Sequence, residues 1–314
     1  MSNRVLLVAI MMLLWLRLSP AAELHDLRLS VEGVDLHATL VEPSTAVTLV
    51  ILHTGSGPTD RNGNQPGMVN NSLLLLSDAL AAANFAVLRY DKRGVGESQS
   101  SQAESDLRPS HYIEDLAAWV EWARSTDRFR AVVLLGHSEG AMFAKAATAL
   151  ARVDAVISLA GSGRPMAALL LEQTEGRRPG DIDRQFRHIL AELEAGRMVD
   201  NVPPLLAALF RPSVQSYLID WLAIDPAQLA DQIDVPLLVV SGSTDLQVAR
   251  ADFDALASHA SQSVWIEGMN HVLKKQSGPL GEQMASYLNP DMPLHEKLAP
   301  VLLDFLREVE KDRW

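Results

Sequence analysis

The chain has 314 residues, 48% of them hydrophobic, and a formal net charge of −12 at pH 7. This composition is sufficient to bury a large core, which excludes an intrinsically disordered protein. The sequence contains no run of Lys or Arg, so the basic surface of a nucleic-acid-binding protein is not expected. It also contains no Cys, which excludes disulfides, thiol catalysis and cysteine-ligated zinc.

The N-terminal segment is typical of a secretory signal peptide. Arg4 precedes an apolar run over residues 5–16, and the small residues of RLSPAAE follow it. The run is shorter than the roughly 20 residues that a membrane span requires. We expect residues 1–22 to be a signal peptide cleaved after Ala21 or Ala22, and an uncleaved anchor is the alternative. A periplasmic or secreted protein without stable membrane association is then expected.

After this leader, short apolar runs typical of strands alternate with longer segments of helical periodicity. Period-two alternation around Gly33 predicts a hairpin over residues 26–43. The continuous apolar runs that follow predict strands covered on both faces. The further elements expected up to residue 161 are strands over 46–53, 86–91, 131–135 and 154–161, and helices over 71–85, 111–125 and 138–150.

The alternation stops between residues 163 and 232, where helix-favouring stretches are broken by Pro and Gly and no buried strand is predicted. It resumes with strands over 235–242 and 263–268 and helices near 249–259 and 294–311. Strands separated by helices predict a mainly parallel sheet with helices on both faces. We therefore expect one α/β core formed by residues 23–162 and 233–314, with an inserted helical cap over residues 163–232.

The segment GHSEG, residues 136–140, lies where the predicted strand 131–135 meets the next helix. Glycines on both sides of Ser138 permit a tight turn that lifts the serine side chain out of the sheet. The carboxyl ends of strands in such sheets form the crevice where ligands bind. Ser138 is thus a candidate nucleophile, and an ordinary glycine-rich turn is the alternative.

A catalytic serine needs a general base, usually a histidine oriented by a carboxylate. On this kind of sheet the expected chain order is serine, acid, histidine, each following the carboxyl end of a strand. Asp245 follows the strand 235–242, and His271 follows the strand 263–268. In isolation, Asp245 could be a turn or helix-capping residue and His271 a surface histidine. Their order and placement favour a triad of Ser138, Asp245 and His271.

An acyl-transfer site also needs donors for the oxyanion that forms at the carbonyl. The expected donors are the backbone N–H of Glu139, directly after the serine, and one N–H from the loop after the third strand. That loop, residues 53–67, is rich in Gly, Asn and Pro, and we assign the N–H of Ser56. A flexible glycine loop is the alternative. A Walker A phosphate site is not expected, because the loop contains no Lys.

Five segments, HTGSGPTDRNGN, RYDKRGVGES, GHSEGA, GSTDLQV and GMNHVLK, follow in this order over roughly residues 25–311. Together they resemble the bacterial α/β-hydrolase serine esterases that carry the G-S-G-P-x-D-R signature. The resemblance implies an α/β-hydrolase fold, a helical cap between the sixth and seventh core strands, and hydrolysis of short-chain acyl esters. It also implies the roles given above for Ser138, Asp245, His271, Ser56 and Glu139. The third strand departs from the family by ending in His-Thr-Gly, where many members have His-Gly.

The resulting hypothesis is a serine carboxylesterase that cleaves a small-molecule ester through an acyl-enzyme on Ser138, without a cofactor or metal. Alternatives are a peptidase, an amidase or a dienelactone-type hydrolase on the same fold, and a non-catalytic binding module. Two ion pairs are expected to brace the loops near the site, Asp60 with Arg61 and Asp91 with Arg93.

Overall fold

The computed structural model describes residues 22–174, 176 and 178–311, so most of the predicted signal peptide lies outside the described residues. The described chain contains an eight-stranded sheet in the order β1-β2-β4-β3-β5-β6-β7-β8. Strands β1 and β2 pair antiparallel with each other, β2 pairs antiparallel with β4, and the remaining neighbours are parallel. The strand bounds are β1 (Glu23–Val31), β2 (Val34–Glu42), β3 (Thr48–His53), β4 (Ala86–Tyr90), β5 (Ala131–His137), β6 (Ala155–Leu159), β7 (Leu237–Gly242) and β8 (Gln262–Ile266).

The character of each strand follows from its sequence. The predicted hairpin is formed by β1 and β2, and its turn places Glu32 and Gly33 at φ of 48° and 80°. Two consecutive left-handed residues are typical of a type I′ turn, whose twist matches that of the paired strands. The apolar runs of β3 and β5 are buried at every residue, as expected for central strands covered on both faces.

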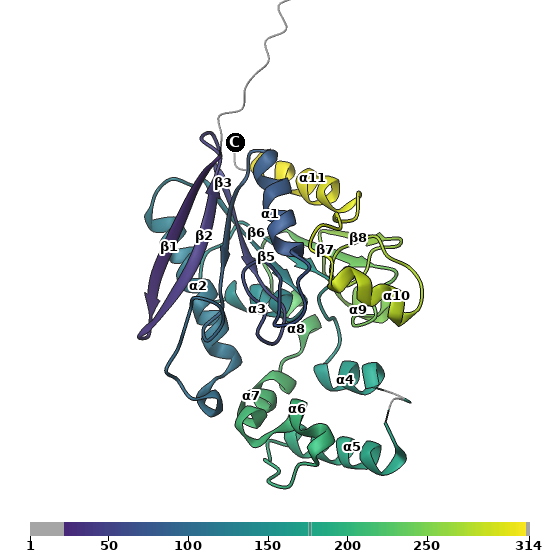
Figure 1. The fold of residues 1–314 in the computed structure, drawn as a ribbon. Coiled ribbons are helices and arrows are strands. Elements are labelled where there is room, and N and C mark those ends of the chain that lie inside the picture. The colour runs from purple at the N-terminus through teal and green to yellow at the C-terminus, as the bar shows by residue number, and fades with distance from the viewer. Residues whose placement is uncertain (1–21, 175, 177, 312–314) are drawn as a thin grey trace, which may run out of the picture.

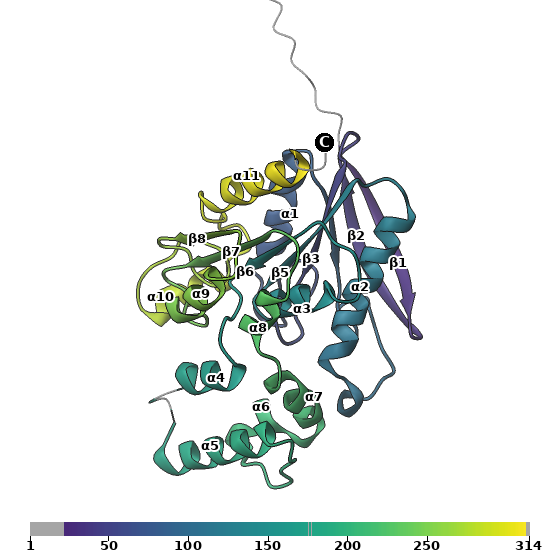
Figure 2. The ribbon, with the colours of Figure 1, turned by 180° about the vertical axis from the view of Figure 1, so that it is seen from behind.

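Helices cover both faces of the sheet (Figures 1 and 2). One apolar core joins the sheet to α1 (Ser72–Ala82) and α11 (Leu298–Lys311). On the opposite face a second core joins the sheet to α2 (Pro109–Ser125), α3 (Glu139–Ala147), α8 (Pro226–Asp231) and α9 (Arg250–Ala257). The predicted three-layer α/β core is therefore present. Within the described residues, no helix is both long enough and apolar enough to span a bilayer.

The segment between β6 and β7 is helical and lies below the sheet in Figure 1. It contains α4 (Met166–Thr174), α5 (Gly180–Glu194), α6 (Ala207–Phe210) and α7 (Pro212–Leu222), and we call these four helices the cap. They enclose a third apolar core, to which Met142 and Phe143 of α3 also belong. The next helix, α8, packs through Ala230 against the core of the sheet and through Leu229 against the core of the cap. The predicted cap segment, residues 163–232, contains these four helices and also α8.

Several elements differ from the sequence-based expectation. The final helix begins at Leu298, whereas the prediction began it near residue 294, and α10 (Leu280–Tyr287) was not predicted. Helix α10 has only eight residues, and its buried positions include the polar Gln283 and Ser286, so its few apolar residues give only a weak periodic signal. Short 3₁₀ turns, η1 (Glu104–Asp106) and η2 (Pro204–Leu206), were likewise not predicted.

Candidate active site

Ser138 lies on a sharp turn between β5 and α3. Its backbone adopts φ 56° and ψ −122°, a left-handed conformation that is rare for a residue with a side chain. The two flanking glycines are required by close backbone approach. A Cβ on Gly136 would lie 2.1 Å from the carbonyl oxygen of Gly140, and a Cβ on Gly140 would lie 2.5 Å from that of Thr54. The G-x-S-x-G pattern therefore reflects a packing constraint that presents the Ser138 hydroxyl above the sheet.

The structure brings Ser138, His271 and Asp245 together from three separate loops. His271 Nε2 lies 3.1 Å from Ser138 Oγ, and His271 Nδ1 lies 2.8 Å from Asp245 Oδ2. Because a carboxylate only accepts hydrogen bonds, Nδ1 carries the proton and Nε2 is free to accept the serine proton. The side chain of Asp245 is fully buried, and that of His271 is 6% exposed. This geometry suits proton transfer between the serine and the imidazole.

The Asp245 carboxylate is fixed by its own backbone turn. Its Oδ1 accepts hydrogen bonds from the N–H groups of Gln247 and Val248, at 2.7 and 3.0 Å. An aspartate that caps a turn with one oxygen can direct the other oxygen at a fixed angle. The sequence left two alternatives for Asp245, a turn residue or the partner of the imidazole. The same side chain fills both roles, one with each carboxylate oxygen.

The loop that carries His271 is braced by two contacts that sequence reasoning missed. His137, next to the serine, donates from Nε2 to the backbone carbonyl of His271 at 2.8 Å. Burial lowers the pKa of His137 to about 4, so this ring stays neutral and adds no second charge beside the His271 imidazole. On the other side, Asn270 donates to Ser286 Oγ of α10 at 2.7 Å. The only sequence signal for either residue was its position next to a predicted site residue.

The loop after β3 passes directly beside the nucleophile. A Cβ on Gly55 would lie 3.1 Å from Cβ of Ser138, so this position cannot easily carry a larger residue. Among the described residues, the backbone N–H groups of Ser56 and Glu139 have no hydrogen-bond acceptor, and both residues line the same cavity as Ser138. The two predicted oxyanion donors are therefore unengaged beside the serine hydroxyl.

Lys92, from the loop after β4, holds this segment in place. Its buried ammonium donates to the carbonyl oxygens of Gly55 and Gly57, the latter at 2.9 Å. The described chain has no cis peptide bond. In a trans peptide the C=O and N–H point in opposite directions. The bond from Lys92 to the Gly55 carbonyl therefore turns the N–H of Ser56, which belongs to the same peptide unit, away from Lys92. Sequence analysis did not identify Lys92 as a site residue.

A buried polar contact links the cap to the nucleophile turn. The hydroxyl of Tyr217, on cap helix α7, donates to Glu139 Oε1 at 2.8 Å. Burial raises the pKa of Glu139, while the nearby charge of Lys92 and the hydrogen bond from Tyr217 oppose that shift. Burial also lowers the pKa of Lys92 to about 8, against the opposing effect of Glu139. Glu139 thus contributes its backbone N–H to the site and its side chain to the cap interface.

The two predicted ion pairs are wrong in their pairing. Arg61 pairs with Asp91 of the next loop, with Nη2 2.7 Å from Oδ2, and Arg93 pairs with Asp115 of α2 at 2.6 Å. Asp60 instead accepts backbone hydrogen bonds within its own loop. These partners lie on a neighbouring loop and on helix α2, 30 and 22 residues away in sequence. All four residues nevertheless brace the loops around the site, as predicted.

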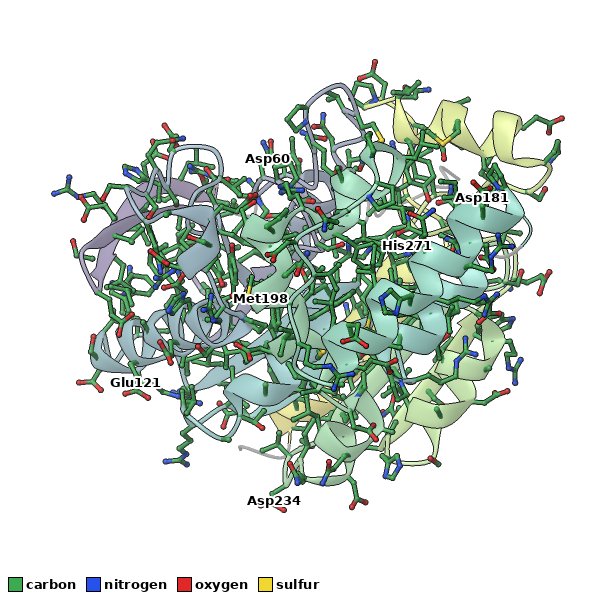
Figure 3. All side chains as sticks on the ribbon, turned by 90° about the horizontal axis from the view of Figure 1, so that it is seen from below. Asp60, Glu121, Asp181, Met198, Asp234 and His271 are labelled. Carbon is green, nitrogen blue, oxygen red and sulfur yellow. The ribbon has the colours of Figure 1, made fainter. Side chains whose placement is uncertain are left out.

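Two cavities meet at Ser138. The larger has a volume of about 570 Å³ and extends beneath the cap, where Met166, Leu169, Leu218 and Trp221 contribute to its lining. The smaller has a volume of about 210 Å³ and reaches His271 from the other side. Figure 3 looks up at the cap and labels His271 near the middle of that face. No group of three His, Asp or Glu side chains that could hold a metal ion occurs within the described ranges.

Comparisons with known proteins identify the family and the fold of the chain. Residues 49–274 match the model of the alpha/beta hydrolase family. Among curated proteins, the chain is similar to esterase EstD of Thermotoga maritima, with 25% identity over 242 residues. The alignment covers 77% of this chain and 55% of EstD, so the chain spans about half the length of that relative.

Solved structures with a similar fold include esterases and a peptidase. Est1E of Butyrivibrio proteoclasticus with bound ferulic acid has a TM-score of 0.61 at 18% identity, covering 91% of this chain and 98% of its own. An esterase of Pyrococcus furiosus has a TM-score of 0.61 at 15% identity, covering 92% and 91%. Proline iminopeptidase of Mycobacterium smegmatis has a TM-score of 0.58 at 13% identity, covering 92% and 99%. At these identities the likeness shows the fold alone, and the predicted fold is confirmed.

Proposed function

The chain belongs to the alpha/beta hydrolase family, and from this premise we propose that it is a serine carboxylesterase acting on a small-molecule ester. We assign it to the esterases that carry the G-S-G-P-x-D-R signature, because the loop after β3 reads GSGPTDR at residues 55–61. The similarity to esterase EstD supports this proposal. The observation that carries it is the continuous hydrogen-bonded path from Ser138 through His271 to Asp245.

The proposed reaction is a two-step acyl transfer. Ser138 Oγ gives its proton to His271 Nε2 and forms a bond to the ester carbonyl carbon, while Asp245 stabilises the resulting imidazolium. The negative oxygen of the tetrahedral intermediate accepts hydrogen bonds from the N–H groups of Ser56 and Glu139. The alcohol leaves with the proton from His271. Water then attacks the acyl-enzyme by the same route, which releases the acid and restores Ser138.

The test is hydrolysis of p-nitrophenyl esters by the wild type and by Ser138→Ala. Loss of the nucleophile should reduce kcat by about 10⁶-fold, and reaction with a fluorophosphonate probe should disappear. Ser258→Ala is a matched control, because that hydroxyl donates only to the carbonyl of Ala255 at the end of α9. An anilide with the same acyl group separates esterase from amidase activity. Wild-type rates in the Ser138→Ala protein would refute the proposal.

We further propose that residues 1–22 direct export and are then removed, so that the enzyme acts in the periplasm or outside the cell. The charged start, short apolar run and small-residue exit of this segment support the proposal. N-terminal sequencing of protein recovered from the periplasm should give a start at Ala22 or Glu23. Full-length protein retained in the membrane fraction would instead support an uncleaved anchor.

A further inference from the structure

We infer that the two cavities beside Ser138 divide the substrate, the larger one binding the acyl group and the smaller one the alcohol. The preferred substrate is then an ester of a bulky, mainly apolar acid with a small hydroxylated alcohol. This inference rests on the proposed esterase function and adds the identity of each half of the ester. It also differs from the short acyl chain that the family resemblance implies.

The direction of proton transfer shows which half of the ester the smaller cavity binds. His271 must deliver its proton to the leaving alcohol, so the alcohol oxygen has to lie within hydrogen-bond reach of Nε2. His271 lines the smaller cavity together with Val272 and Tyr287, and it does not line the larger one. An alcohol placed in the larger cavity would extend away from the imidazole that has to protonate it. The alcohol therefore occupies the smaller cavity.

The four substituents of the tetrahedral carbon show which half of the ester the larger cavity binds. One is the bond to Ser138 Oγ, one is the oxyanion at the N–H groups of Ser56 and Glu139, and one is the alcohol oxygen near His271. The acyl chain is the fourth substituent and takes the direction that is left. Glu139 lines only the larger cavity, which opens from the serine on the side away from His271. The acyl chain therefore extends beneath the cap.

The lining of the larger cavity indicates the chemistry of the acyl group. Its volume of about 570 Å³ lies within the range of roughly 300–1,000 Å³ that is usual for sites of drug-sized ligands. The cap supplies an apolar wall from Leu169, Leu170, Val214, Leu218 and Trp221. A two-carbon acyl group would leave most of this wall in contact with water. A long or aromatic acyl group would bury it, and the burial of apolar area is favourable.

The smaller cavity has a different character. Its volume of about 210 Å³ is below the usual range for drug-sized ligands, so the alcohol is small. Its lining is about equally polar and apolar, and the polar side chains include Thr59, Gln65, Asn70 and Ser72. Ser72 is 2% exposed, and its hydroxyl has no hydrogen-bond partner among the described residues. Because Ser72 lines the cavity, a hydroxyl group on the alcohol would give the Ser72 hydroxyl a hydrogen-bond partner there.

Two isomeric esters test the assignment directly, methyl phenylpentanoate and phenylbutyl acetate. They contain the same atoms and differ in which side of the ester bond carries the phenylalkyl group. We expect kcat/KM for the methyl ester to exceed that for the acetate by at least about 10-fold, because the bulky group fits only the acyl side. A glycerol monoester of phenylpentanoic acid should in turn exceed the propyl ester.

Two variants test which cavity is responsible for the preference on the acyl side and which for the preference on the alcohol side. Leu218→Trp narrows the larger cavity and should lower the ratio of kcat/KM between methyl phenylpentanoate and phenylbutyl acetate. Met68→Trp narrows the smaller cavity, which Met68 lines, and should lower the ratio between the glycerol and methyl esters of phenylpentanoic acid. Leu218→Trp should leave the ratio between the glycerol and methyl esters within about twofold, and Met68→Trp should not lower the ratio between the two isomers. Thermal unfolding and fluorophosphonate labelling show that each variant is folded and has a reactive serine.

A preference for phenylbutyl acetate, or equal rates on the two isomers, would overturn the assignment of the cavities. The proposed esterase function would survive that result, because hydrolysis of either isomer still requires the activated serine. If neither isomer is hydrolysed and the wild-type protein does not react with the fluorophosphonate, the esterase function itself is wrong, and the inference is wrong with it.

Discussion

Replacement of Lys92 by Met is expected to reduce catalysis without removing any group of the Ser138, His271 and Asp245 set. The substitution keeps an unbranched side chain of similar length and removes the ammonium that bonds to the carbonyl oxygens of Gly55 and Gly57. Without those bonds, the peptide between Gly55 and Ser56 is free to rotate. The Ser56 N–H then loses its fixed direction toward the developing oxyanion.

The expected magnitude follows from the bonds that are lost. A hydrogen bond to a charged group contributes about 1.5–3 kcal/mol, which corresponds to roughly 10- to 150-fold in rate if it acts only on the transition state. Loss of a complete oxyanion donor costs about 10²–10³ in kcat, which sets the upper limit. Since Lys92 orients one of two donors and leaves the other in place, we expect kcat to fall by about 10- to 100-fold.

The assay compares kcat, KM and the inhibition constant of a boronic acid that forms a tetrahedral adduct with the serine. Because Lys92 also lines the larger cavity, a loss confined to substrate binding would raise KM and leave kcat unchanged. Orientation of the oxyanion donor instead predicts that kcat and boronate affinity fall together. Lys92→Gln keeps a hydrogen-bond donor and should recover part of the lost rate. Unchanged kcat and boronate affinity in a folded Lys92→Met protein would refute the reasoning.

Three further substitutions test other parts of the structure. Asp245→Asn should lower kcat by about 10⁴-fold at pH 7, because an amide that donates to the imidazole favours the wrong tautomer, and a rate within tenfold of wild type would contradict the triad. Gly140→Ala places a Cβ 2.5 Å from a carbonyl oxygen of the loop after β3 and should abolish activity and lower Tm, whereas Gly281→Ala, whose Cβ meets nothing within 4 Å, should change neither. Lys145 is buried with no hydrogen-bond partner for its ammonium among the described residues, and burial lowers its pKa from 10.5 to about 7. The unfolded state then binds more protons than the folded state between these two values, so this residue makes wild-type stability rise with pH across that window. Lys145→Met should be more stable than wild type at pH 6, by a few kcal/mol in urea unfolding, and should lack that rise. Equal pH slopes for the two proteins would show that the ammonium is not desolvated.

The positions of the strands and of the candidate triad could be predicted from the sequence because they depend on local constraints. Buried parallel strands require continuous apolar runs, and the turn at Ser138 requires glycine at positions 136 and 140. Asp245 and His271 were identifiable because each directly follows a strand whose carboxyl end lies at the same edge of the sheet. The cap was also predicted from a local pattern, because a helical segment without a buried strand interrupts the strand–helix alternation.

Helix α10 was not predicted, although it holds the loop of His271 through the hydrogen bond from Asn270 to Ser286. Gly278 and Pro279 before the helix and Gly281 within its first turn obscure the helical signal. A helix of two turns with few apolar residues leaves only a weak periodic pattern for sequence analysis to detect.

The sequence by itself determined the kind of sheet, the turn that exposes Ser138, and the order of the three residues that meet there. Only the tertiary structure decided that Arg61 pairs with Asp91, that Lys92 bonds to the loop of Ser56, and that Tyr217 reaches Glu139. The physical reason is the distance along the chain over which each effect acts. Periodicity and glycine geometry act over a few neighbouring residues, whereas the partner of a buried charge or hydroxyl is whichever group the packed chain places within about 3 Å of it.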